Sequence, residues 1–131
     1  MKPGLREQVR RRAGGRCEYC HMPERLSRLR FQLDHVIAEK HGGPLTAGNL
    51  ARACYRCNSH KGPNLAGWDE KSGVVRLFNP RCDLWEEHFR WSGPRLMGKT
   101  LVGQATVNVL CMNRPETMQL RESWIREGIL L

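Results

Sequence analysis

Four of the six cysteines in the chain stand in two pairs of the form CxxC. The pairs are Cys17 with Cys20 and Cys54 with Cys57. A spacing of two residues lets both sulfur atoms of a pair reach one tetrahedral ion at ~2.3 Å. The two pairs can converge from different elements, so the 33 residues between Cys20 and Cys54 are only a loose constraint. The pattern predicts a structural zinc ion whose four protein ligands leave no position open for water.

The alternatives for these four residues are a redox-active CxxC pair and a group of free buried thiols. The other two cysteines, Cys82 and Cys111, have no partner at this spacing. Cys111 also lies in an apolar stretch with a helical pattern. We therefore expect Cys82 and Cys111 to be free thiols in the protein interior.

Residues whose chemistry suits phosphodiester hydrolysis lie between and beside the cysteine pairs. An imidazole titrates near neutral pH, so His35 is suited to take a proton from water. The carboxylate of Asp34 and the amide oxygen of Asn58 are ligands for a hard cation such as Mg²⁺ or Mn²⁺. Taken singly, these residues have plainer explanations: an exposed Asp–His pair, and a helix cap at Asn58. Asn49 taken singly would be a turn residue.

The order of these residues, DHVIAEKHGG followed by NLARACYRCNSHK, resembles the motif of the HNH endonucleases. The resemblance covers roughly residues 5 to 63, and the aromatic-rich tail is also similar to that of small stand-alone HNH proteins of bacteria or phages. It implies a ββα-metal module supported by zinc knuckles. Ala38 stands where many family members carry proline, a difference that concerns the stiffness of the loop more than the chemistry.

The resemblance also implies roles for four residues. His35 would be the general base, and Asn49 would constrain the following loop and orient that histidine. Asp34 and Asn58 would bind one catalytic ion, Mg²⁺ or Mn²⁺ or another divalent ion such as Ni²⁺. That ion would act on the scissile phosphate and on the leaving 3′ oxygen, and the products would carry 5′-phosphate ends.

The charge of the chain points to a polyanionic partner. The formal net charge is +9 and the pI is near 9.8, which favours nucleic acid, although a merely soluble basic protein has the same signature. Lys61 follows Asn58 at i+3, so the two share a helix face and Lys61 is placed to contact phosphate. The weaker candidates for phosphate contact are Arg52, Arg56, the loop residue His41 and the basic run 10–12.

The hydrophobic pattern predicts the elements that position these residues. In the first half we expect a helix over 5–13, a strand over 29–37, an extended piece over 49–53 and a short helix ending near Gly62. In the second half we expect a strand over 74–78 and helices over 103–111 and 115–127, whereas 85–91 fits either a strand or a helix.

The aromatic residues of the second half are expected to pack in its core, with stacking on bases as the alternative; they are Trp68, Trp85, Phe89 and Trp91. Leu120 and Trp124 predict a packed face on the last helix, which would also suit a dimer seam. The pattern leaves open whether His88 reaches the active site.

These elements predict an α+β protein with one domain and a small extension. Residues 1–66 would form the ββα-metal module with its four-cysteine zinc site, and residues 67–131 would form a small α/β extension packed on it. No apolar run of about 18 residues is present, so we expect no membrane span. The segment MKPGLREQVRRRAGG is too charged for a secretory signal, so we expect a cytoplasmic protein.

The sequence therefore predicts a metal-dependent DNA endonuclease that uses one ion. The main alternative is a zinc-stabilised domain that binds nucleic acid without cutting it, although such a domain needs none of Asp34, His35, Asn49 and Asn58. A second alternative is an RNA substrate, for which the sequence offers no recognisable RNA-binding module. The cleavage site, the choice between a nick and a double-strand break, and the oligomeric state do not follow from the sequence.

Overall fold

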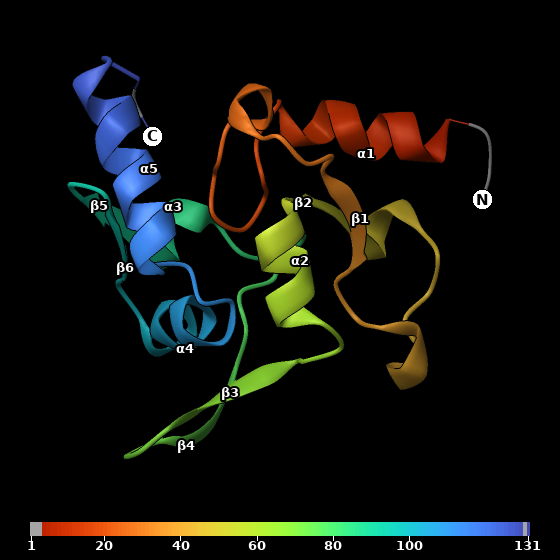
Figure 1. Ribbon diagram of the computed structural model, residues 1–131. Coiled ribbons are helices and arrows are strands. Elements are labelled where there is room, and N and C mark those ends of the chain that lie inside the picture. Colours follow the sequence, from red (N-terminus) through yellow and green to blue (C-terminus); the bar gives the residue numbers. More distant parts are fainter. Residues whose placement is uncertain (1–3, 130) are drawn as a thin grey trace.

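The computed structural model describes residues 4–129 and 131 of the chain. Among these residues, three separate two-stranded antiparallel sheets alternate with helices (Figure 1). The helices are α1 (Leu5–Ala13), α2 (Tyr55–Lys61), α3 (Trp85–His88), α4 (Leu101–Val109) and α5 (Pro115–Arg126), with 3-10 turns at Glu24–Leu26, Glu39–His41 and Ala47–Asn49. The strands are β1 (Gln32–His35), β2 (Leu50–Ala53), β3 (Ala66–Asp69), β4 (Gly73–Arg76), β5 (Phe89–Ser92) and β6 (Arg95–Gly98).

The first half contains the β-hairpin and helix that the sequence predicts. Strand β1 pairs with β2 so that His35 lies opposite Leu50, and α2 packs against β1. Helix α1 has the predicted bounds, and it ends at Gly14, which adopts a left-handed conformation with φ of 64°. Strand β1 is shorter than the predicted strand over 29–37, because a turn held by Ser27 precedes it and leaves Leu29 55% exposed.

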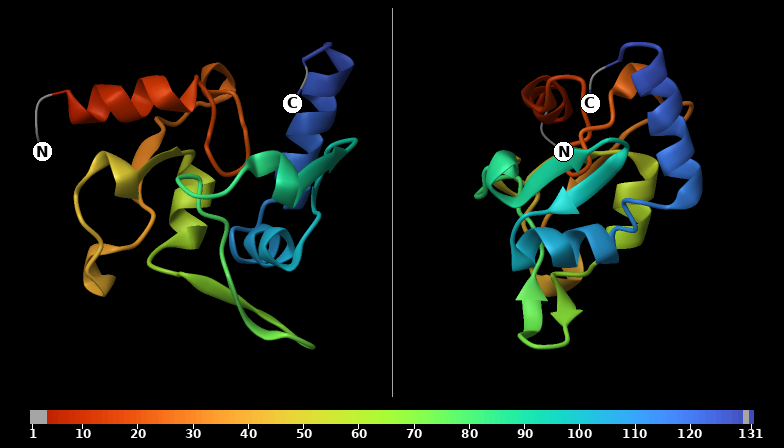
Figure 2. Two further views of the ribbon diagram at one scale, coloured as in Figure 1. Left: turned by 180° about the vertical axis from the view of Figure 1, so that it is seen from behind. Right: turned by 90° about the vertical axis from the view of Figure 1, so that its left-hand side faces the viewer.

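The second half consists of two hairpins and two longer helices. Hairpins β3–β4 and β5–β6 both pack against α4, and β3–β4 projects from the body of the molecule (Figure 2). The ambiguous segment 85–91 contains both structures, because α3 passes directly into β5 at Phe89. Helix α5 begins with Pro115 at its first turn, as predicted. Strands β3 and β6 lack a strong alternating pattern and were not predicted from the sequence.

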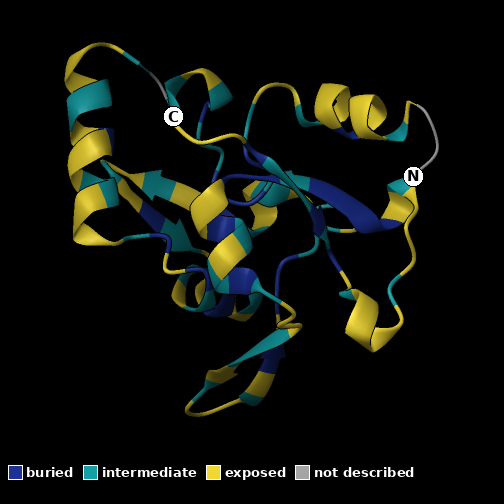
Figure 3. Ribbon diagram, turned by 45° about the vertical axis from the view of Figure 1, so that its right-hand side comes forward, coloured by how far each residue is buried: buried dark blue, intermediate teal, exposed yellow. Residues whose placement is uncertain are grey.

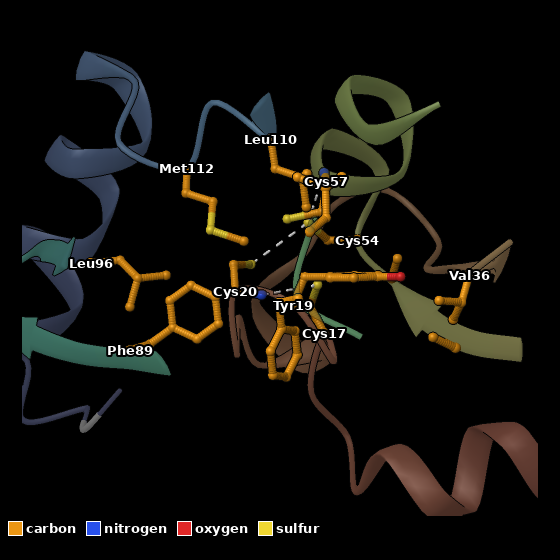
Figure 4. Close-up of a cluster of buried hydrophobic side chains, with 14 of the residues drawn as sticks. Cys17, Tyr19, Cys20, Val36, Cys54, Cys57, Phe89, Leu96, Leu110 and Met112 are labelled. Carbon is orange, nitrogen blue, oxygen red and sulfur yellow. Dashed lines mark hydrogen bonds between the residues drawn. The ribbon is translucent and has the colours of Figure 1, made fainter. Parts of the chain in front are cut away.

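One cluster of buried side chains joins the two halves. The rings of Tyr19 and Phe89 both contact Phe78 in edge-to-face geometry, at centroid distances of 6.4 and 5.2 Å. Trp85 also crosses between the halves, since its Nε1 donates a hydrogen bond of 2.8 Å to the carbonyl of Tyr19. Figure 4 shows this cluster continuing from the four cysteines to Phe89 and the apolar residues beside it. The extension therefore shares its core with the segment that carries the first cysteine pair.

Several residues that the sequence predicts to lie in the interior are exposed in the structure. Cys82 and Cys111 are exposed, since Cys82 lies in the loop before α3 and Cys111 has a left-handed backbone just after α4. Trp68 is 71% exposed on β3, which lies at the projecting hairpin. On α5, Leu120 is 44% exposed, and the residue that is buried is Arg121 (Figure 3 shows the exposed and buried faces). No helix among the described residues is long and apolar enough to span a membrane.

Replacing Gly103 with alanine is expected to destabilise the fold. A Cβ at Gly103 would lie 2.1 Å from the carbonyl oxygen of His88, so backbone would have to move where α4 meets α3. We expect a loss of about 1–3 kcal/mol in the free energy of unfolding, measured by urea denaturation. Gly48→Ala is the control, because a Cβ there meets no atom within 4 Å. Equal stability of the two variants would contradict the packing described.

Candidate active site

The two CxxC pairs converge on one point in the interior. The ligand atoms of the four cysteines all lie within 4.8 Å of one another, and all four residues are buried. Each pair forms a knuckle in which the second cysteine donates a backbone hydrogen bond to the sulfur of the first: Cys20 N to Cys17 Sγ at 3.5 Å, and Cys57 N to Cys54 Sγ at 3.4 Å. Cys54 thereby also caps α2.

This donor set fits a structural zinc ion. Four sulfur ligands and no open position are typical of such sites, and the knuckle amides are placed to stabilise thiolate charge. Burial raises the pKa of the Cys17 thiol well above its usual value, so a cation is needed to favour the thiolate form. The predicted ligands Cys17, Cys20, Cys54 and Cys57 are therefore brought together as expected.

Asp34 lies in a hydrogen-bonded network under α2. Its carboxylate is buried, with one oxygen accepting from the hydroxyl of Tyr19 at 2.5 Å and the other from the ammonium of Lys61 at 3.2 Å. Burial raises the pKa of Asp34, while Lys61 and then Tyr19 lower it. Because Tyr19 stands between Cys17 and Cys20, the zinc knuckle directly contacts the predicted ion ligand.

Lys61 fixes the end of β1. It is 1% exposed, and its ammonium also donates to the backbone carbonyls of His35 at 3.1 Å and Val36 at 3.0 Å. With Asp34, these acceptors use all three N–H groups of the ammonium. This position does not fit the predicted contact between Lys61 and a phosphate, because the charge is buried and paired. Lys61 instead holds the backbone that carries His35.

Asn49 closes the loop that follows His35. Its side chain accepts a hydrogen bond from Ile37 N and donates to the carbonyls of Ile37 and Pro44, each at 2.9 Å. The loop has no room for a side chain at Gly43, where a Cβ would lie 1.7 Å from the Ile37 carbonyl oxygen. The buried Asn49 side chain therefore ties both ends of the loop to the start of β2.

The imidazole of His35 is only partly enclosed. Its side chain is 25% exposed, and Nε2 lies 3.7 Å from the carboxylate of Glu39. Nε2 itself is buried and has no hydrogen-bond partner among the described residues. A buried polar atom without a partner is costly, so this nitrogen is suited to a water molecule, a substrate group or an ion.

Asn58 faces β1 from α2. Its amide nitrogen donates to the side-chain oxygen of Gln32, which shares a strand face with Asp34. Asn58 and Asp34 therefore lie on the facing surfaces of α2 and β1, with Lys61 one helical turn further along.

The remaining predicted phosphate contacts differ in their surroundings. Arg52 is paired with Glu24 at 2.7 Å and its side chain is 12% exposed, so it is largely committed inside the protein. Arg56 is exposed and donates to the hydroxyl of Thr117, and His41 is exposed at the loop after His35. His88 contacts Thr100 and Phe78 in the extension and makes no described contact with His35.

Sequence reasoning missed three members of this site: Tyr19, Gln32 and Glu39. Gln32 could have been found by strand alternation, since it lies two residues before Asp34. Glu39 follows His35 at i+4 in a loop, where no periodicity applies. The contact of Tyr19 with Asp34 arises because the first knuckle lies against β1, and no local sequence pattern reveals that arrangement.

Comparisons with known proteins identify relatives of the segment that carries these residues. The family model described as HNH endonuclease matches residues 17–64, which confirms the resemblance for that segment. Over 115 residues the chain is 27% identical to the Septu protein PtuB of Bacillus thuringiensis, covering 86% of this chain and 42% of that protein. The chain thus spans less than half the length of this relative. No solved structure gives a significant match.

Removal of zinc is expected to unfold the protein. Metal analysis of the purified chain should give about one zinc per molecule, and a strong chelator should abolish the cooperative thermal transition followed by circular dichroism. Cys82→Ser and Cys111→Ser, which alter exposed thiols outside the cluster, should retain the zinc. A metal-free chain with an unchanged transition would contradict the assignment.

Tyr19→Phe is expected to destabilise the zinc-loaded protein by about 1–3 kcal/mol, because it leaves a buried carboxylate oxygen of Asp34 without its donor. Urea denaturation at saturating zinc measures this loss. Tyr55→Phe is the matched control, since Tyr55 is 48% exposed and should change stability by less than about 0.5 kcal/mol. Indistinguishable midpoints for the two variants would show that the Tyr19–Asp34 bond contributes nothing.

Proposed function

We propose that this protein is a metal-dependent endonuclease that hydrolyses phosphodiester bonds in DNA, because residues 17–64 match the family model described as HNH endonuclease. An HNH domain indicates a nuclease or nucleic-acid-binding function. The choice of catalysis over binding alone rests on the residues around His35.

The observation that carries the proposal is the hydrogen bonding around the His35 imidazole. Its Nε2 is buried and has no hydrogen-bond partner in the part of the chain that the structure describes, although the backbone on both sides is tightly held. Lys61 holds the carbonyl of His35, and Asn49 holds the loop that begins at Val36 and Ile37. A fixed imidazole with a free nitrogen is the arrangement that a general base requires.

In the proposed reaction, His35 takes a proton from the attacking water as the water approaches the phosphorus atom. Lys61 and Asn49 keep the imidazole in place without contacting the substrate. The carboxylate of Glu39, which is 81% exposed, is near enough to Nε2 to stabilise the protonated imidazole.

Asp34 and Asn58 are the residues that we propose to hold a divalent ion, Mg²⁺ or Mn²⁺ or another such as Ni²⁺. Each oxygen of Asp34 accepts one hydrogen bond in the structure and keeps a further lone pair for a ligand. When bound, the ion would supply stabilisation of negative charge on the phosphate and on the leaving 3′ oxygen.

Exposed arginines support DNA as the partner. On α1, Arg6, Arg10 and Arg11 are exposed, although Arg10 and Arg11 both pair with Glu7. In the loop before β1, Arg25, Arg28 and Arg30 are exposed and form no ion pair with a described carboxylate. Unpaired exposed arginines are available to phosphates, and binding through them should weaken steeply as salt is raised.

His35→Ala is expected to reduce the cutting of supercoiled plasmid by at least about 100-fold in the presence of Mg²⁺, Mn²⁺ or Ni²⁺. His60→Ala is the control, since His60 lies on α2 near Arg114 and outside the proposed site.

Asp34→Asn should raise the metal concentration needed for half-maximal cutting, whereas Glu39→Gln should leave it unchanged. Cutting is followed by gel electrophoresis, and 5′-phosphate ends by ligation.

Equal cutting by the wild type and His35→Ala would contradict the assignment of the base. If the wild type cuts with none of these ions but binds DNA tightly and in a salt-sensitive manner, the non-catalytic binding module is the better description. If Glu39→Gln raises the metal concentration needed for half-maximal cutting and Asp34→Asn does not, the ion lies beside His35 and Glu39 instead.

A further inference from the structure

Arg121 is a buried cation without a carboxylate partner. It is 4% exposed, and it is the buried residue of α5. Among residues 4–129 and 131, no Asp or Glu side chain forms an ion pair with it, although Lys61, the other buried cation, has Asp34. Burying an unpaired charge costs several kcal/mol, so the position calls for a source of negative charge.

The direct partners of Arg121 are neutral. One guanidinium nitrogen donates to the carbonyl of Pro94 and to the side-chain oxygen of Asn113, both at 3.1 Å. The other donates to the carbonyl of Met112 at 2.8 Å, and the guanidinium carbon lies 5.1 Å from the centre of the Trp91 ring. These contacts orient the guanidinium, but none of them carries a full negative charge.

The four-cysteine site lies on the same cavity as this guanidinium. A cavity of about 560 Å³ is lined by Arg121 and by three of the four cysteines, Cys20, Cys54 and Cys57. Among the residues that the structure describes, no Asp or Glu side chain lines it, whereas Arg28, Arg56 and the C-terminal residue Leu131 do. Met112, whose carbonyl binds Arg121, belongs to the same buried cluster as the cysteines and is drawn beside them in Figure 4.

We propose that Arg121 is the counter-ion of the zinc–tetrathiolate centre. Four thiolates and one Zn²⁺ carry a formal charge of about −2, a negative charge that no described Asp or Glu side chain lining this cavity supplies. Burial lowers the pKa of the guanidinium, whereas Cys20, Cys57 and Cys54 act in the opposite direction. The pairing does not depend on the nuclease reaction.

The pairing gives the zinc centre a role in fixing α5. This helix leaves Leu120 and Ile125 44% and 42% exposed, so apolar packing holds it only in part. Arg121 reaches from its middle toward the cavity that the cysteines line. The charge of the zinc centre therefore stabilises the position of α5 against the rest of the fold.

The test measures zinc affinity by competition with a chelator, using the full chain. Arg121→Met should weaken zinc binding by about tenfold or more, whereas Arg121→Lys, which keeps the charge, should stay within about threefold. Arg126→Met on the exposed side of the same helix should leave the affinity unchanged. Equal losses for Arg121→Met and Arg121→Lys would overturn the proposal, because hydrogen bonding would then explain them.

A double-mutant cycle separates charge from packing. Cys20→His reduces the formal charge of the zinc centre from about −2 to about −1. In that background, the fold-loss of zinc affinity caused by Arg121→Met should therefore fall to a third or less of its value in the wild type. An undiminished effect would assign Arg121 a packing role alone and overturn the proposal. Circular dichroism at saturating zinc verifies folding; if Arg121→Met does not fold, Arg121→Gln, which retains amide donors, takes its place in the cycle.

Discussion

Four sulfur atoms within 4.8 Å of one another tie the first knuckle to the segment that joins β2 to α2. A core of modest size does not by itself hold these short elements, since each sheet has only two strands. The cysteine cluster supplies the missing constraint at one point. From it, Cys54 caps α2, Tyr19 reaches Asp34, and the apolar cluster continues into the extension.

The predicted catalytic hairpin depends on buried polar groups more than on apolar packing. Lys61 binds one side-chain oxygen and two backbone carbonyls near the end of β1, and Asn49 makes three bonds across the following loop. Such groups are stable only when every donor has a partner. Beside this network, Nε2 of His35 is a buried atom that has no hydrogen-bond partner within residues 4–129 and 131.

Local signals made part of this structure predictable. The CxxC pairs, the helix over 5–13, the short helix after Cys54 and the proline that begins α5 are all encoded within a few residues. Lys61 was assigned to phosphate because its helix face is visible in the sequence, but the carbonyls that enclose it lie on β1. Arg121 was missed for the same reason: its partners come from the turn between β5 and β6, from Trp91 on β5 and from the segment between α4 and α5, and a charged residue is normally expected at the surface.

Tyr19 stands between Cys17 and Cys20 and bonds the carboxylate of Asp34, so an ion held by the cysteines would also order the end of β1. On these assignments, a chain without zinc would lose the support that the first knuckle gives to Asp34 and, through Lys61, to the backbone of His35. On the proposed function, this coupling would make any nuclease activity of the chain depend on zinc occupancy.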